Sequence, residues 1–158
     1  MNLLTENERC KVMDLSHGKY LGVDYGDVRT GLAECDASGM LASGIATIRE
    51  GGMRNTAVRV AAEAEKRNCK RIIVGLPKNM DGSEGFRADA VKAFVEILRS
   101  LTHIEIDFYD ERMSTVEAYR FLDSTGAFGK RRKDAVDTLS AQIILQSYID
   151  RERNLKKN

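Results

Sequence analysis

Two acidic residues could do chemistry because each follows a predicted strand. Asp24 comes after the apolar run Tyr20–Val23, and Gly26 then lets the backbone turn where a Cβ would clash. Glu111 follows the alternating run Ile104–Tyr109. A carboxylate at a strand end has a rigid support and faces solvent, as a metal or phosphate site requires. An ordinary β-hairpin with Asp in its turn would give the first pattern equally well.

A third acid, Asp137, falls in a segment with helical periodicity. Steps of four, three and four residues lead from it to Ala141, Ile144 and Tyr148. We expect this side of the helix to face the sheet and to take Asp137 with it. An ionised carboxylate aimed at a core is costly unless something compensates its charge.

Two kinds of compensation are compatible with these positions. Three acids from separate elements around Mg²⁺ or Mn²⁺ form the arrangement used in two-metal phosphodiester hydrolysis. Alternatively, Asp137 pairs with Arg29 or Arg112 in a buried salt bridge, and Glu111 is only a solvated strand end. The positions alone do not choose between these alternatives.

Other chemistries have little support in the sequence. The two histidines, His17 and His103, are not near a nucleophile motif, and no phosphate-binding loop or dinucleotide fingerprint is present. Three cysteines without a Cys-x-x-Cys pair predict neither a disulfide framework nor a zinc site. No apolar run approaches the ~20 residues that span a bilayer, so we expect no membrane association and a cytoplasmic location.

The elements needed to position the acids can be read from the periodicity. Length (158 residues) and composition (42% hydrophobic, 31% charged) are those of one globular domain. Strands are predicted over 19–24, 29–34, 40–48, 69–75 and 104–109, and helices over 54–68, 84–101, 114–122 and 134–153. The order βββαβαβαα predicts an α/β fold: a mixed five-stranded sheet with helices on both faces. Residues 1–18 are expected to be an N-terminal extension, 19–153 the domain, and 154–158 a C-terminal tail.

The C-terminal part of the chain is basic. Residues 125–158 contain eight Lys or Arg and four acids, a net charge of +4, whereas the rest carries −3 of the overall +1. Four of these cations, Lys130, Arg131, Arg132 and Lys133, are consecutive and are predicted to lie in a loop over 123–133. This cluster could contact a phosphate backbone, although a solvated loop explains it equally well.

Four motifs in this order resemble those of the YqgF family of ribonuclease H-like proteins. The first is Gly22-x-Asp24-x-Gly26-x-x-Arg29-x-Gly31-x-Ala33, and the second combines Val74–Pro77, Met80–Ser83 and Arg87-Ala88. The third is Asp110-Glu-Arg112-x-Ser-Thr115, and the last is Val136-Asp137-x-x-Ser-Ala141. The matches run from about Tyr20 to Asp150. Ser140 departs from the usual Ala, and the first 18 residues lie outside the pattern.

The resemblance implies roles for particular residues. Asp24, Glu111 and Asp137 match the catalytic positions and would hold Mg²⁺ or Mn²⁺. Arg29, Arg87 and Arg112 would contact or orient the substrate phosphates, unless each is paired with a neighbouring acid.

The sequence therefore predicts a ribonuclease H-like, metal-dependent nuclease that acts on structured nucleic acid. The resemblance implies that its substrate is the end of precursor 16S ribosomal RNA, with a Holliday junction in branched DNA as the alternative. A binding module without catalysis is a rival, which the intact trio of acids argues against. A second rival is half of an actin-like ATPase or kinase. Such proteins enclose a nucleotide between two domains of this kind, and a chain of this length supplies one.

Overall fold

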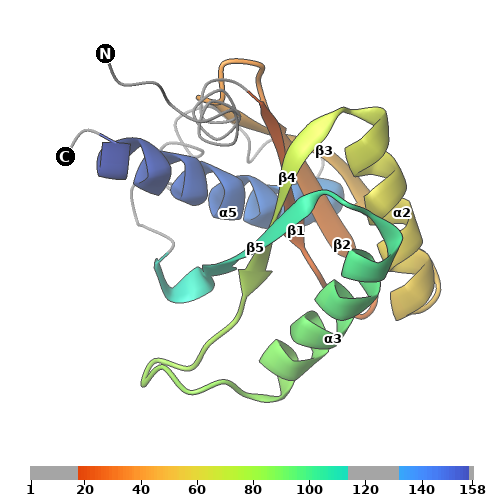
Figure 1. Ribbon diagram of the computed structural model, residues 1–158. Coiled ribbons are helices and arrows are strands. Elements are labelled where there is room, and N and C mark those ends of the chain that lie inside the picture. The colour runs from red at the N-terminus through yellow and green to blue at the C-terminus, as the bar shows by residue number, and fades with distance from the viewer. Residues whose placement is uncertain (1–17, 114–131, 157–158) are drawn as a thin grey trace, which may run out of the picture.

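The computed structural model describes residues 18–113 and 132–156, and side chains only for 18–113 and 138–156. Five strands, three helices and one 3₁₀ turn are present in these ranges (Figure 1). The strands are β1 (Lys19–Asp24), β2 (Thr30–Cys35), β3 (Ala42–Ile48), β4 (Cys69–Leu76) and β5 (Glu105–Asp110). The helices are α2 (Met53–Lys66), α3 (Phe86–Leu101) and α5 (Arg132–Lys156), and the 3₁₀ turn is η1 (Glu111–Met113). No helix in these ranges is apolar over enough of its length to cross a membrane.

The strands form one mixed sheet in the order β3-β2-β1-β4-β5. The first three pair antiparallel, as expected of strands joined by short turns. β4 and β5 are reached through α2 and α3 and add parallel to β1. The carboxyl ends of β1, β4 and β5 therefore lie along the same edge of the sheet. This edge is where open α/β sheets bind ligands.

Each face of the sheet is covered by helix (Figure 1), and the alternation of side chains along the strands produces two cores. Leu21 and Val23 of β1 join the core that α2 and α3 cover, where Phe94 is fully buried. Ile73 of β4 joins the second core, in which α5 contributes Leu145. The predicted arrangement of helices on both faces is thus confirmed.

The second core is thin because glycines face α5. A Cβ at Gly22 would lie 2.7 Å from the Cβ of Leu145 and 2.9 Å from the carbonyl oxygen of Ala141. A Cβ at Gly44 would lie 2.8 Å from the Thr138 Cβ. The backbones of β1 and β3 therefore approach the helix more closely than any larger residue would permit.

The predicted elements agree with the observed ones to within two residues, except at the C-terminal helix. The predicted loop over 123–133 is wrong at its end, because α5 begins at Arg132. Lys and Arg are good helix formers, and Asp134 in the first turn favours the N-terminal end of the helix dipole. α5 also continues to Lys156, three residues beyond the predicted end. The predicted helix over 114–122 and most of the loop over 123–131 lie outside the described residues.

Candidate active site

Asp24 is the last residue of β1, the central strand of the sheet. Leu21 and Val23 point into the core under α2 and α3, so alternation places the half-buried Asp24 on the α5 side. The turn that follows is tight, because a Cβ at Gly26 would lie 2.4 Å from the carbonyl oxygen of Arg29. The buried Thr30 hydroxyl bonds both the N–H and the carbonyl of Gly26 at 3.4 Å. The local fold thus holds Asp24 at the edge.

Glu111 begins η1, directly after β5, and its side chain reaches over β4. Its Oε1 would lie 2.7 Å from a Cβ placed on Gly75. Only a glycine at this position of β4 leaves room for the carboxylate. The turn itself is held by the buried Tyr109, whose hydroxyl donates a 3.0 Å hydrogen bond to the carbonyl of Met113. Glu111 is therefore oriented by two residues that the strand pattern alone does not single out.

Asp24 and Glu111 line one pocket, with a volume of about 70 Å³, at the carboxyl edge of the sheet. Other parts of its lining come from the turn after β1, through Tyr25, and from the start of α3, through Phe86 and Arg87. Tyr25 is buried and stacks on Phe94 of α3, with ring centroids 4.3 Å apart. This stack ties the turn that carries Asp24 to the helix that carries Arg87.

The charge of Glu111 is only partly compensated by its described neighbours. Burial raises the pKa of its carboxyl, nearby Arg87 lowers it, and the negative charge of Asp110 raises it further. Among the described residues Glu111 forms no salt bridge. A carboxylate in this state favours either a proton or a cation.

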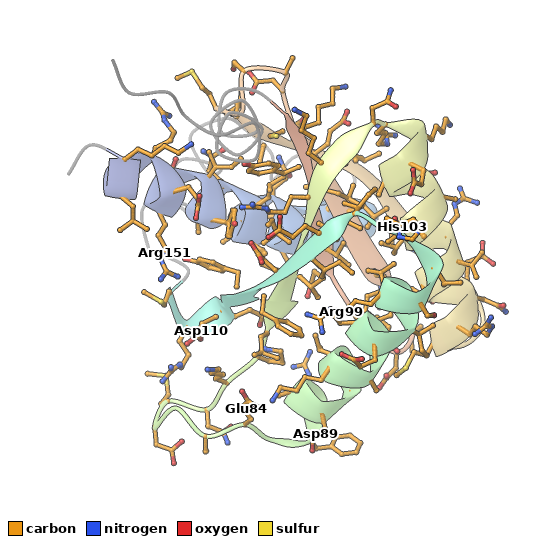
Figure 2. The ribbon with its side chains drawn as sticks, viewed as in Figure 1. Glu84, Asp89, Arg99, His103, Asp110 and Arg151 are labelled. Carbon is orange, nitrogen blue, oxygen red and sulfur yellow. The ribbon has the colours of Figure 1, made fainter. Side chains whose placement is uncertain are left out.

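Asp110 differs from its neighbour Glu111. It accepts a bidentate pair of hydrogen bonds from Arg112, one of 3.1 Å from Nε to Oδ1 and one of 2.7 Å from Nη2 to Oδ2, and these bonds hold the pKa of Asp110 below its usual range. The Arg112 guanidinium also lies against Gly82, which adopts a φ of +88°. Arg112 therefore pairs with Asp110 and contacts the loop before α3. Asp110 is labelled in Figure 2.

The backbone of α5 brings Asp137 toward the same edge. Along β1, Tyr20 packs edge-on against Tyr148, whereas Gly22 lies against Leu145 and Ala141. Moving along β1 toward Asp24 therefore means moving along α5 toward its N-terminus, where Asp137 lies one turn before Ala141. The apolar stripe that predicted this side of the helix is confirmed, since Ala141, Ile144 and Tyr148 are all buried against the sheet. The side chain of Asp137 lies outside the described part of the structure.

The predicted phosphate contacts occupy different positions. Arg87 is exposed and lines the pocket; its charge lowers the pKa of the Glu111 carboxyl, although the two form no salt bridge among the described residues. Arg29 is exposed in the turn after β1. Arg132 and Lys133 belong to the first turn of α5, with side chains outside the described set. Lys130 and Arg131 lie outside the described residues altogether.

The residues at this edge fit a hard divalent cation. Two carboxylates from different elements present oxygen ligands, and the half-buried Glu111 carries a charge that a cation would compensate. Among the described side chains, no group of three His, Cys, Asp or Glu is close enough together to hold a metal ion. Asp24 and Glu111 would be two of its protein ligands, and Asp27 is a further acid in the lining of the pocket.

Curated relatives match most of the chain. A protein of Clostridioides difficile is 38% identical over 133 residues, which cover 84% of this chain and 94% of the relative. One from Caldanaerobacter subterraneus is 39% identical over 86% of this chain and 99% of the relative. One from Ruegeria pomeroyi is 41% identical over 85% of this chain and 87% of the relative. All three are designated candidate pre-16S rRNA nucleases.

Solved structures share the fold at low sequence identity. The RuvC of Thermus thermophilus in complex with a Holliday junction substrate superposes with a TM-score of 0.61 at 11% identity, covering 86% of this chain and 96% of RuvC. The large terminase nuclease of the thermophilic phage G20c gives a TM-score of 0.52 at 12% identity, covering 81% of this chain and 82% of the terminase chain. The predicted ribonuclease H-like fold is thereby confirmed.

A family model described as "RuvX: Holliday junction resolvase" matches residues 18–151. It spans every described element that contributes to the pocket, including the strand ends that carry Asp24 and Glu111 and the start of α3. The chain therefore belongs to the RuvX family, also called YqgF, and is a hydrolase that acts on nucleic acid.

Proposed function

We propose that this protein is a divalent-metal-dependent nuclease that processes the end of precursor 16S ribosomal RNA. The observation that carries the proposal is the meeting of Asp24 and Glu111 in one pocket, with Glu111 half-buried and lacking a described salt bridge. The designation of relatives at 38–41% identity favours the RNA substrate. The family description favours branched DNA as the second candidate.

Asp24, Glu111 and Asp137 would hold Mg²⁺ or Mn²⁺ through their carboxylate oxygens. When bound, the cation would polarise the scissile phosphate and activate the attacking water, which would explain why the described lining of the pocket contains no histidine. The chain's own residues do the positioning. The tight turn at Gly26 fixes Asp24, and the Tyr109 hydroxyl fixes the turn that presents Glu111.

Arg87 would bind a substrate phosphate beside the two acids. Its side chain is exposed at the pocket, and the positive charge is available for a charge-assisted hydrogen bond. Arg112, held by Asp110, would keep the loop before α3 in place and so orient the pocket wall. The cations from Lys130 to Lys133 would bind the phosphate backbone as well, in contacts that carry little sequence information.

A cleavage assay tests the proposal directly. Precursor 16S RNA and a four-way DNA junction are offered with Mg²⁺ or Mn²⁺ to the wild type and to Asp24→Asn. Asp89→Asn serves as a matched control, because Asp89 is an exposed acid on α3 outside the lining of the pocket. We expect Asp24→Asn to lose cleavage and Asp89→Asn to keep it. Equal cleavage by the wild type and Asp24→Asn would falsify the assignment of the metal site, and preference for the junction would favour the DNA substrate.

Metal binding can be measured without catalysis. A ligand that binds only the folded state stabilises it by about 2.7 kcal/mol at a hundred times its Kd. We therefore expect Mg²⁺ or Mn²⁺ to raise the melting temperature of the wild type and to leave that of Glu111→Gln nearly unchanged. The same rise in both proteins would place the cation elsewhere.

A further inference from the structure

Phe86 is a large apolar side chain left open to solvent beside the acids. It is the first residue of α3, is 85% exposed, and lines the same pocket as Asp24 and Glu111. Burying a side chain of this size contributes about 1.5–3 kcal/mol relative to leaving it exposed. Phe86 therefore contributes none of this burial energy to the stability of the fold.

The described packing gives Phe86 no role in the core. The buried stripe of α3 consists of Ala88, Val91, Phe94, Val95 and Leu98, which face the sheet and α2. Phe86 lies on the opposite side of the helix from this stripe, by the helical period. Its exposure is thus a consequence of where α3 begins, directly after Gly85, and at this position it lines the pocket.

The size of the pocket decides which part of a substrate can enter it. At about 70 Å³ it is far smaller than the roughly 300–1,000 Å³ of typical small-molecule sites. The space between the acids suits a phosphate oxygen or a cation, not a nucleobase. The base next to a phosphate held there must lie outside, on the rim.

The rim at Phe86 has the chemistry that binds an unpaired nucleotide. Aromatic side chains stack on bases that are not already stacked in a duplex, and a neighbouring cation binds the backbone. Arg87, the next residue, is that cation, and it forms no salt bridge within the described part of the chain. An aromatic ring and an adjacent guanidinium therefore both line the pocket.

We propose that Phe86 is a stacking platform for an unpaired base next to the scissile phosphate, so that the nuclease selects substrates that are single-stranded at the point of cleavage. This inference rests on the proposed nuclease function and adds a specificity-determining residue to it. Base readout is not required, because every base has a face on which to stack. Selectivity would arise instead from whether the nucleotide is paired.

The test measures binding, not cleavage. Single-stranded RNA and duplex RNA of the same sequence are titrated by fluorescence anisotropy, with EDTA present to prevent hydrolysis. We expect Phe86→Ala to weaken binding of the single strand roughly 5- to 150-fold and to leave duplex binding nearly unchanged. Phe86→Trp should bind the single strand at least as well as the wild type does. Met80→Ala is the matched control, because Met80 is 92% exposed on the preceding loop but does not line the pocket.

A second readout reports stacking itself. A single-stranded RNA with 2-aminopurine at successive positions should show fluorescence quenching at one position with the wild type and none there with Phe86→Ala. Equal losses for single strand and duplex, or no loss with Phe86→Ala, would overturn the proposal. So would a change only in self-association, measured by sedimentation, which would make Phe86 a contact between copies of the chain. Because neither readout needs cleavage, a failure of the metal site leaves this test intact.

Discussion

The two ends of the parallel strands differ in how their charges are compensated. At the amino end, Arg71 pairs with Glu105 at 3.2 Å and Asp107 at 3.5 Å, and donates a 2.8 Å hydrogen bond to the hydroxyl of Tyr148. At the carboxyl end, Glu111 is half-buried without a described salt bridge. Figure 2 marks the two ends of β5 with His103 and Asp110.

The hollow at the amino end is nevertheless the larger one. Its volume is about 540 Å³, against about 70 Å³ at the carboxyl end, and its lining includes Arg71, Cys69 and the exposed His103. Of the two acids in its lining, Glu105 pairs with Arg71, and Glu65 accepts a 2.8 Å hydrogen bond from the Thr102 hydroxyl. The proposed active site is therefore the smaller of the two hollows, and it was assigned from the partly compensated charge of Glu111 and not from volume.

The largest expected effect is on the cleavage rate, when Glu111 at the carboxyl end of the strands is replaced. Glu111→Gln should lower the cleavage rate roughly 1,000-fold, since a metal ligand supplies several kcal/mol to the transition state. The free energy of unfolding should stay the same or rise, because a partly buried charge is removed. Cleavage assays and urea denaturation measure the two quantities.

Arg71→Ala should show the reverse pattern. Removing the guanidinium leaves Asp107 and the Tyr148 hydroxyl without their shared partner, and we expect a loss of about 2 kcal/mol in the free energy of unfolding. The cleavage rate per folded molecule should change less than about threefold. A large drop in that rate would mean that the amino end also serves catalysis.

A substitution at Gly75 of β4, beneath Glu111, should have an intermediate effect on stability and on the cleavage rate. A Cβ at Gly75 would lie 2.5 Å from Ile144 Cδ1 and 2.7 Å from Glu111 Oε1. Gly75→Ala should therefore cost about 1–3 kcal/mol in unfolding free energy and displace the carboxylate, lowering the cleavage rate as well. Gly51→Ala is the control, because a Cβ there meets no atom within 4 Å. Unchanged activity in Gly75→Ala would remove Glu111 from the site.

A smaller effect should follow from neutralising the basic cluster. Replacing Lys130, Arg131, Arg132 and Lys133 with Gln should weaken binding of RNA and make its salt dependence less steep. The slope should fall by about 0.7–0.9 for each phosphate that the protein no longer neutralises. Affinity measured across a salt series checks this. If the slope stays constant, the cluster is an ordinary solvated segment.

The smallest effect concerns the thiol at the amino end. Burial raises the pKa of Cys69 to about 11, so the reactive thiolate is scarce at neutral pH and grows about tenfold per pH unit until pH approaches the pKa. Alkylation by iodoacetamide should follow this profile in a variant with Cys10 and Cys35 changed to Ser. Rapid alkylation at pH 7 would show that the hollow is more reactive than its paired charges imply.

The sequence was sufficient for the elements and for the position of two acids, because both depend on local periodicity. β1 was predicted with its observed bounds, and Asp24 and Glu111 were placed at strand ends that the structure brings to one pocket. The packing that lets Glu111 reach the pocket of Asp24 was not predictable. It depends on Gly75, whose missing side chain matters only once β4 and β5 lie side by side.

Phe86 was missed for a related reason. A phenylalanine at the start of an amphipathic helix is usually a core residue, and its exposure follows from where Gly85 starts α3. Arg112 illustrates the opposite case, since its phosphate-contact role was inferred from a motif and the structure pairs it with Asp110. Local sequence patterns predict which residues lie at the carboxyl edge of the sheet. Tertiary contacts decide which of those side chains are exposed and which are paired with a neighbour.

The order of the strands also bears on when the protein becomes active during synthesis. The meander of β1, β2 and β3 involves neighbours in sequence and can form early, whereas β5 pairs only after α3 has been made. Asp24 therefore leaves the ribosome long before Glu111, and the helix that packs behind both comes last. We expect a nascent chain to be harmless to the RNA around it until its C-terminal helix has emerged.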